Sequence, residues 1–131
     1  MQYLAVLVAA AGAYAFGAFW YMLNAKAWMA AAGIPQDAEG KPAGGSSPAP
    51  FIISAIMVIV VAGMMRHIFI MAGIDTLGEG FMGGGGLGLF IVAPWIVTNY
   101  AYSMRPLALT LIDGAYAVIG CTIIGMILTL F

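Results

Sequence analysis

Asp113 is the residue of this sequence best placed to do chemistry, because it is the only charged residue in the apolar run 107–131. An ionised carboxylate at membrane depth costs at least a few kcal/mol unless a partner or water stabilises it. Asp113 lies six residues past the start of its run, about 9 Å along a helix, and Asn99 lies at a similar depth before Arg105. We therefore expect one polar cluster at the cytoplasmic end of the molecule, made of Asn24, Lys26, Asn99, Arg105 and Asp113.

Two interpretations of Asp113 remain open. In the first, Asp113 accepts a proton or cation in a pathway for a small solute, with Lys26 or Arg105 as its counter-ion. In the second, Asp113 fastens helices together by accepting hydrogen bonds from Asn99 and a cation, or from Tyr116 or Tyr21. The fastening role is favoured, because the site is shallow enough for long basic side chains to reach and neutralise it.

A second group of ionisable residues lies toward the opposite side: Arg66, His67, Asp75 and Glu79. The sequence predicts a salt bridge from Arg66 to one of the two acids. Met64, His67 and Met71 fall on one helical face, a pattern that would suit Cu(I) or an axial haem ligand. Because ten methionines are scattered along the chain, packing explains this stripe better, and we expect no metal and no cofactor.

Nothing in the sequence points to catalysis. The four glycines 83–86 are not followed by Gly-Lys-Ser/Thr, so they do not make a phosphate-binding loop. Cys121 has no histidine near it in sequence, and zinc-ligand spacing is absent. We expect no catalytic residue and no enzyme, and the net charge of −1 argues against a nucleic-acid partner.

The elements that must position these residues are transmembrane helices. Of 131 residues 64% are hydrophobic and 7% charged, and the mean hydropathy is +1.07. A crossing needs roughly 20 apolar residues, so the chain has room for four. We predict a single all-α domain over 1–131, an up-down-up-down bundle of transmembrane helices at about 3–32, 51–74, 80–104 and 107–131, with a flexible loop at 33–50.

Orientation follows from the cations. Lys26, Lys41 and Arg105 lie on one side and Arg66 on the other, which predicts that the loop is cytoplasmic and both termini are outside. The first span has no basic residue before it and is therefore expected to be a span that stays, not a signal peptide. We expect an aromatic belt at the cytoplasmic interface, formed by Trp20, Tyr21, Trp28, Tyr100 and Tyr102.

Small residues recur at helical spacing on three of the spans. Such ridges let helix backbones approach closely. We expect them to pack within the bundle in preference to an interface between subunits. The predicted packing residues are Ala9, Ala13 and Gly17 on the first span, Gly80, Gly84 and Gly88 on the third, and Ala117, Cys121 and Gly125 on the fourth.

Several of these residues occur in stretches that resemble a known family. Phe19-Trp20-Tyr21 with Lys26-Ala27-Trp28-Met29, and Asn99-Tyr100 with Arg105-Pro106-Leu107 and Asp113-Gly114-Ala115-Tyr116, are similar to the bacterial membrane family called domain of unknown function 1761. The resemblance covers nearly the whole chain and implies a multi-pass protein of the bacterial inner (cytoplasmic) membrane. It implies no reaction. In that family the position of Asp113 is often Asn, which leaves its charge without a family-wide role.

Two classes of function fit the sequence. The first is a structural or accessory membrane protein that acts through helix contacts with itself, as a homo-oligomer, or with another membrane protein complex, in addition to membrane lipids. The alternative is a minimal oligomeric transporter or channel for a small solute or ion. A polar cavity that reaches Asp113 or Arg66 would favour the transporter, and paired, closed charges would favour the accessory role.

Overall fold

The computed structural model describes residues 2–131, and the elements in this range are helices without a strand. They are α1 (Gln2–Leu23), α2 (Ala25–Ala32), α3 (Ala49–Ala72), α4 (Leu77–Leu87), the π-helical η1 (Gly88–Val92), α5 (Ala93–Tyr102) and α6 (Leu107–Leu128). Four helices in this range are long and apolar enough to cross a membrane: α1, α3, the continuous segment α4–η1–α5, and α6. The predicted all-α class with four apolar helices is confirmed.

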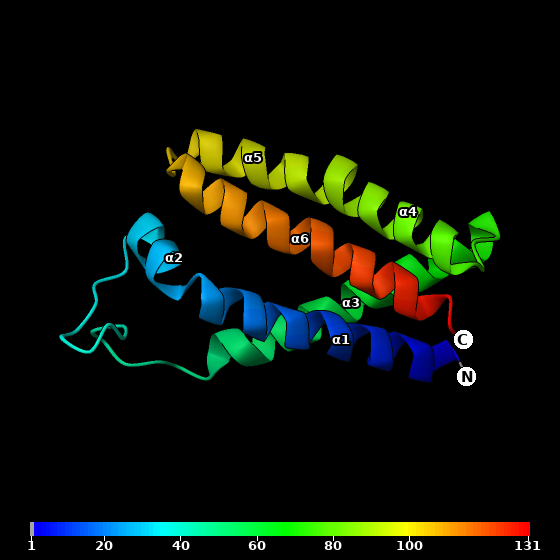
Figure 1. Cartoon of the computed structure of the whole chain (residues 1–131), viewed down its shortest axis with the longest axis horizontal. Helices are drawn as coiled ribbons and strands as arrows, with labels where there is room; N and C mark the ends of the chain where they lie inside the picture. The colour runs from blue at the N-terminus through cyan, green and yellow to red at the C-terminus, as the bar shows by residue number, and fades with distance from the viewer. Residues whose placement is uncertain (1) are drawn as a thin grey trace.

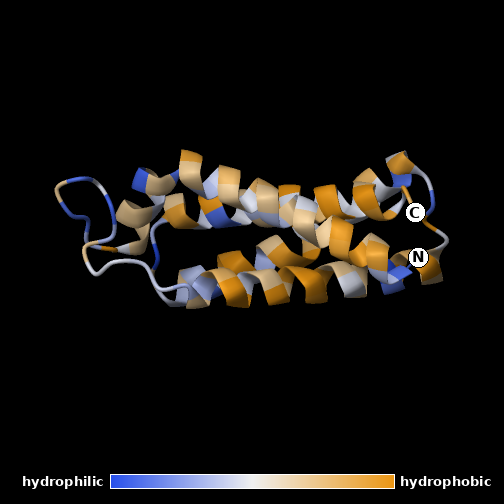
Figure 2. Cartoon of the chain, turned by 90° about the horizontal axis from the view of Figure 1, so that it is seen from below, coloured by the Kyte–Doolittle hydropathy of each residue, from blue (hydrophilic) through white to orange (hydrophobic). Residues whose placement is uncertain are grey.

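The four long helices lie alongside one another and the chain reverses direction between them, so that the two chain ends lie at one end of the bundle (Figure 1). We call this the terminal end. The opposite, loop end carries α2, the loop between α2 and α3, and the tight turn between α5 and α6 (Figure 1). Hydrophilic residues concentrate at the two ends, most of all in that loop, and apolar residues fill the length between them (Figure 2).

The most extensive interface joins α4 and η1 to α6, and glycine makes it possible. A Cβ atom on Gly80 would lie 2.6 Å from the carbonyl oxygen of Gly125, and one on Gly88 would lie 2.7 Å from Cα of Val118. A Cβ on Gly84 would collide with the carbonyl oxygen of Cys121. The glycine row of the third span therefore lies directly against the row of small residues on α6, backbone against backbone.

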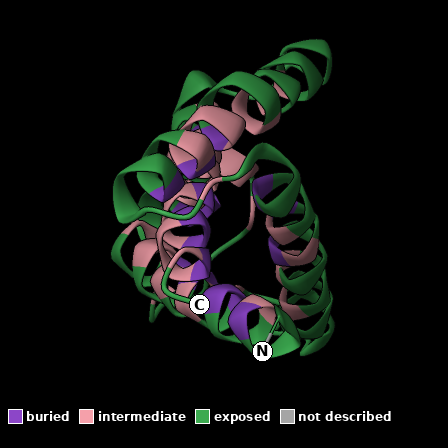
Figure 3. Ribbon diagram, turned by 90° about the vertical axis from the view of Figure 1, so that its right-hand side faces the viewer, coloured by how far each residue is buried: buried purple, intermediate pink, exposed green. Residues whose placement is uncertain are grey.

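On α1, alanine and glycine likewise allow neighbouring helices to approach closely. Ala9 and Ala13 are buried, and Gly17 leaves room for the ring of Tyr116, whose Cε2 would lie 2.8 Å from a Cβ at that position. With Phe69 of α3 and Leu128 of α6, these positions belong to the interior of the bundle. Figure 3 shows the buried residues turned inward and the exposed ones over the outer surface, as expected where lipid covers the outside.

Two of the four predicted spans are not continuous α-helices in the structure. The first, 3–32, is divided at Asn24, whose φ of −100° and ψ of 11° leave the helical range and separate α1 from α2. The third contains Pro94, which cannot donate a backbone hydrogen bond. There the helix widens into η1, where Ala93 N–H donates to the carbonyl of Gly88, five residues earlier. The chain thus accommodates Pro94 by a local widening of the helix just before it.

Candidate functional site

The carboxylate of Asp113 is the acceptor at the centre of a cluster of aromatic donors at the loop end. Its Oδ1 accepts hydrogen bonds from the Tyr21 hydroxyl at 2.6 Å and from Trp28 Nε1 at 3.1 Å. Its Oδ2 accepts a hydrogen bond from the Tyr100 hydroxyl at 2.6 Å. We call Asp113, Tyr21, Trp28 and Tyr100 the Asp113 cluster; its three donors come from α1, α2 and α5 and its acceptor from α6.

The break at Asn24 explains how two donors from one stretch of chain reach the same oxygen. In an unbroken helix, Tyr21 and Trp28 would be separated by about 10 Å along the axis. The break turns α2 so that it packs against α6, which brings Trp28 to Asp113. The side-chain amide of Asn24 donates to the carbonyl oxygen of Trp20 at 2.8 Å, and the backbone N–H of Asn24 donates to the same oxygen at 3.0 Å, so Asn24 is tied to the last turn of α1 by two hydrogen bonds.

Aromatic packing fixes the rings of the cluster. The Tyr21 ring meets the Trp28 ring edge-on, with centroids 6.0 Å apart, and the Tyr116 ring with centroids 5.2 Å apart. Trp20 Nε1 donates to the carbonyl oxygen of Ile112 at 3.0 Å, one residue before Asp113. Edge-to-face contacts add stability beyond burial and restrict ring rotation, so the donors Tyr21 and Trp28 are held in position.

The predicted polar cluster is only partly what the structure brings together. Asp113 is bonded by aromatic residues, and the expected bonds from Asn99 and a cation are not among its contacts. Asn99 and Lys26 are exposed. The exposed Arg105 donates from Nη1 to the carbonyl oxygen of Ala32 at 3.2 Å, which links the turn before α6 to the end of α2.

Counting residues from the turn predicts the correct depth for the partner of Asp113 on α5 but not the correct face of the helix. Each residue turns an α-helix by about 100°, so Tyr100, one position after Asn99, points inward where Asn99 points outward. Tyr21, the named alternative partner, does bond Asp113. Trp28 and Tyr100, which the sequence predicts in the interfacial aromatic belt, direct their polar atoms inward to Asp113. The spacing of Tyr100 and Asp113 across a short turn was the available signal.

The charged residues near the terminal end do not form the expected salt bridge. Arg66 donates from Nη1 to the carbonyl oxygen of Leu128 at 2.9 Å, near the end of α6, where a cation is favourable to the helix dipole. Glu79 caps its own helix: its Oε2 accepts from Thr76 N, Thr76 Oγ1 and Asp75 N, and its amide donates back to Thr76 Oγ1. Glu79, one of the two acids predicted as partners of Arg66, is thereby committed to the start of α4, and the other, Asp75, is exposed.

His67 is exposed, as are Met64 and Met71, so the stripe that could have bound a soft metal faces outward. Among residues 2–131 no group of three or more His, Cys, Asp or Glu side chains is arranged to hold a metal ion. The residues of this stripe contribute to the outer surface of α3 and not to the interior of the bundle.

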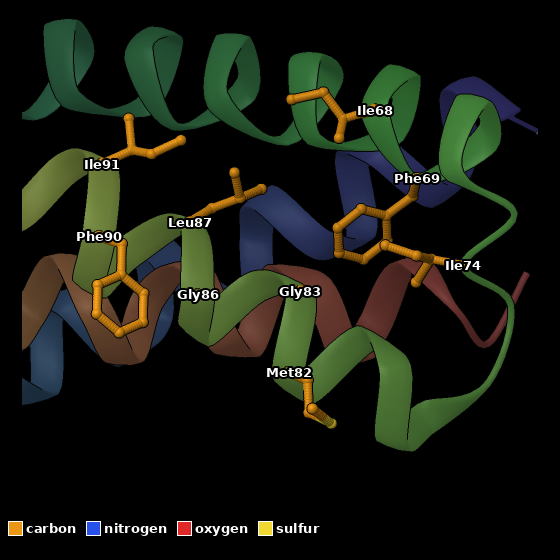
Figure 4. Close-up of a pocket in the computed structure, with 9 residues that line it drawn as sticks. All are labelled: Ile68, Phe69, Ile74, Met82, Gly83, Gly86, Leu87, Phe90 and Ile91. Atoms are coloured by element: carbon orange, nitrogen blue, oxygen red, sulfur yellow. The ribbon is translucent and has the colours of Figure 1, made fainter.

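Two open, apolar grooves lie between helices in the described part of the chain. One, of about 340 Å³, lies between α3 and the α4–η1 segment (Figure 4). The other, of about 180 Å³, lies between α1 and α3. Neither Asp113 nor Arg66 lines either groove.

The family described as Protein of unknown function (DUF1761) matches residues 4–129. No curated protein and no solved structure matches the chain.

Proposed function

The chain belongs to the DUF1761 family of proteins of unknown function, as its residues predicted, and from its geometry we propose a structural or accessory role in the membrane. In this proposal the protein is not an enzyme and acts through contacts of its helices with copies of itself or with a larger membrane complex. Four helices long and apolar enough to cross a membrane, with no soluble domain within residues 2–131, supply the surface for such contacts.

The observation that carries the proposal is the set of hydrogen bonds that Asp113 accepts from within the chain. Both carboxylate oxygens accept hydrogen bonds from within the chain, two of them at 2.6 Å. A residue that binds and releases protons or cations during transport needs access to water, whereas Asp113 is partly buried and three of its roughly four acceptor positions are taken by donors of the same chain. The Asp113 carboxylate instead joins four segments, so its contribution is to hold α1, α2, α5 and α6 in one arrangement.

The second intramembrane charge supports the same role. Arg66 is half-buried and donates from Nη1 to a backbone carbonyl of α6, so it too joins two helices; its buried Nε has no hydrogen-bond partner within residues 2–131. The grooves are lined by apolar residues and offer no polar route for a solute. A transporter of this size would require such a route between subunits or along the bundle.

Proton flux tests the proposal against the transporter alternative. The protein is reconstituted in liposomes that contain a pH-sensitive dye, and a potassium diffusion potential drives protons inward. We expect the same flux as in protein-free liposomes, for the wild type and for Asp113→Asn. Flux above the protein-free level that Asp113→Asn removes, and that the loop variant Asp37→Asn retains, would establish a transport pathway and overturn the accessory role.

Self-association tests the contact that the proposal requires. Copies carrying a donor or an acceptor fluorophore on Ser46→Cys, in a Cys121→Ala background, are mixed in liposomes at increasing lipid content. Ser46 lies in the exposed loop, away from the helix surfaces. Energy transfer that persists on dilution supports contacts between copies; transfer that falls to the level of randomly mixed monomers restricts the proposal to a different membrane protein as partner.

A further inference from the structure

Arg66 is a cation of α3 to which no acidic side chain of residues 2–131 is hydrogen-bonded. In this part of the chain its guanidinium donates from Nη1 to the carbonyl oxygen of Leu128, which is uncharged, and it carries several further N–H donors. Arg66 is half-buried, and a charged residue within a transmembrane helix is costly unless an anion or water compensates it. The described chain therefore positions this cation without neutralising it.

The acids of the described chain that could balance Arg66 have other roles or positions. Glu79 accepts hydrogen bonds from the backbone and hydroxyl of Thr76 at the start of α4. Asp75 is exposed, and its carboxylate takes part in no hydrogen bond of the described chain. Asp113 lies in the cluster at the loop end, bonded by aromatic donors. An anion from outside the chain can therefore approach Arg66 without displacing an acid of the chain.

The bond to Leu128 fixes the depth of the guanidinium. Leu128 is the last residue of α6, whose 22 residues extend over about 33 Å, close to the roughly 30 Å thickness of the bilayer hydrocarbon. The Cα atom of Arg66 lies about 9 Å from the end of α3 at Ala72, and its long side chain extends from there to the end of α6. The guanidinium therefore lies where hydrocarbon meets headgroups, at the terminal end of the bundle.

Only part of the guanidinium is open to a ligand. The Nε atom of Arg66 is buried and has no hydrogen-bond partner within residues 2–131, so the chain encloses it. Nη2 also has no partner in this part of the chain, but it is not enclosed in this way. A ligand can therefore reach the Nη groups, one of which is held in place by the carbonyl of Leu128.

The depth and the chemistry of this position favour a phosphodiester. Phospholipid phosphates lie just outside the hydrocarbon, at the level of the guanidinium. Arginine forms directional, charge-assisted hydrogen bonds with phosphate, and basic positions between transmembrane helices bind lipid headgroups. A phosphodiester is present at this depth around every copy of the protein, whereas the carboxylate of another protein would require a second, specific interface.

We propose that Arg66, held by Leu128 at the junction of α3 and α6, binds the phosphate of a membrane phospholipid in the leaflet at the terminal end. The phosphate neutralises the guanidinium, and the bound lipid strengthens the junction of two helices that touch over only a small area. The binding does not depend on the accessory role, because it requires no partner protein.

Solid-state magnetic resonance measures the proposed contact directly, because Arg66 and Arg105 are the only arginines of the chain. Protein with Arg105→Lys and with arginine labelled with 13C at Cζ carries the label only at Arg66. It is placed in phosphatidylcholine bilayers in phosphate-free buffer, and carbon–phosphorus dipolar recoupling is recorded. We expect dephasing that corresponds to about 4 Å between Cζ and the lipid phosphorus, as in a hydrogen-bonded pair. Absence of dephasing would overturn the proposal.

A matched variant tests whether the contact is specific. Lys41→Arg, with both native arginines replaced by lysine, places the label in the exposed loop. Its dephasing should be severalfold weaker than that of Arg66, and equal dephasing would reduce the contact to non-specific proximity and overturn the proposal. A sample in maltoside detergent with inorganic phosphate tests a soluble anion. Dephasing there, together with none in the phosphate-free bilayers, would assign the position to free phosphate instead of lipid.

Thermal melting separates the effect of the phosphate from that of the acyl chains. Protein in maltoside detergent is mixed with dioleoylphosphatidylcholine or with a neutral glycolipid that has the same acyl chains and no phosphate. The melting temperature of the wild type and of the loop control Lys41→Gln should rise more with the phospholipid, and that of Arg66→Gln should rise equally with both. A wild type that does not distinguish the two lipids, or a folded Arg66→Gln protein that still does, would contradict the proposal. The magnetic resonance test keeps Arg66 and does not depend on the folding of Arg66→Gln.

Discussion

The hydroxyl of Tyr100 lies 2.6 Å from Oδ2 of Asp113, and this bond joins two antiparallel helices across the turn that connects them. The carboxylate has its other oxygen bonded by Tyr21 and Trp28, so the α5–α6 hairpin and the α1–α2 segment share one acceptor. Because the donors belong to separate helices, removing one of them should weaken an interface without disturbing the helices themselves.

Tyr100→Phe should lower the free energy of unfolding by about 1–2 kcal/mol, because it removes one hydrogen bond to a carboxylate and keeps the ring. Unfolding in mixed detergent micelles with increasing sodium dodecyl sulfate measures the change. Tyr102→Phe is the control: Tyr102 is 88% exposed, so loss of its hydroxyl should change the free energy little. Equal effects of the two substitutions would show that the bond to Asp113 contributes nothing.

Asp113→Asn and Asp113→Leu should differ strongly. Asparagine can place its carbonyl oxygen toward Tyr21 and Trp28 and its amide toward Tyr100, whose hydroxyl accepts as well as donates, so we expect a cost of about 1 kcal/mol. Leucine offers no acceptor and leaves three donors unpaired, and we expect a cost of about 3 kcal/mol or more. The same detergent titration measures both, and a leucine variant as stable as the asparagine variant would contradict the fastening role.

Trp28→Phe should weaken the attachment of α2 to α6. Phenylalanine keeps an aromatic ring and loses the N–H that donates to Asp113, so the segment Ala25–Ala32 would be held mainly by Arg105 and by packing on α6. Amide hydrogen exchange measured by mass spectrometry should show faster exchange in α2 and unchanged exchange in α6. Trp95→Phe, at a tryptophan of α5 that is 66% exposed, should change neither.

The extent to which the sequence predicts this structure differs between the helices and the site. The four spans follow from hydropathy, because a backbone in lipid must satisfy its own hydrogen bonds within helices. The packing of Gly80, Gly84 and Gly88 against the small residues of α6 follows from spacing, since residues four apart share one face of a helix.

The partners of Asp113 do not follow from the same reasoning. Depth in the membrane is set by counting residues from the turn, and on that basis Asn99 is as good a partner as Tyr100. Whether Asn99 or Tyr100 faces Asp113 depends on the rotation of α5 about its axis. Because the sequence of α5 is largely apolar, it does not indicate which face turns inward. The position of Trp28 depends on the break at Asn24. No proline or glycine lies at this position, so the sequence does not predict the break.

Gly84→Ala should be among the most damaging single-methyl additions in the chain. Its Cβ would collide with the carbonyl oxygen of Cys121 and lie 3.1 Å from Cα of Gly125, and backbone atoms of α6 cannot move aside as a flexible side chain can. The helices must separate, which loses contacts along the whole α4–α6 interface, and we expect a cost of about 2–3 kcal/mol against a small gain in helix propensity. Gly78→Ala adds the same methyl group to the same helix with nothing within 4 Å, so it should be neutral or slightly stabilising. Detergent unfolding of the two variants compares them directly, and a Gly84→Ala protein as stable as Gly78→Ala would mean that α4 and α6 are not in backbone contact.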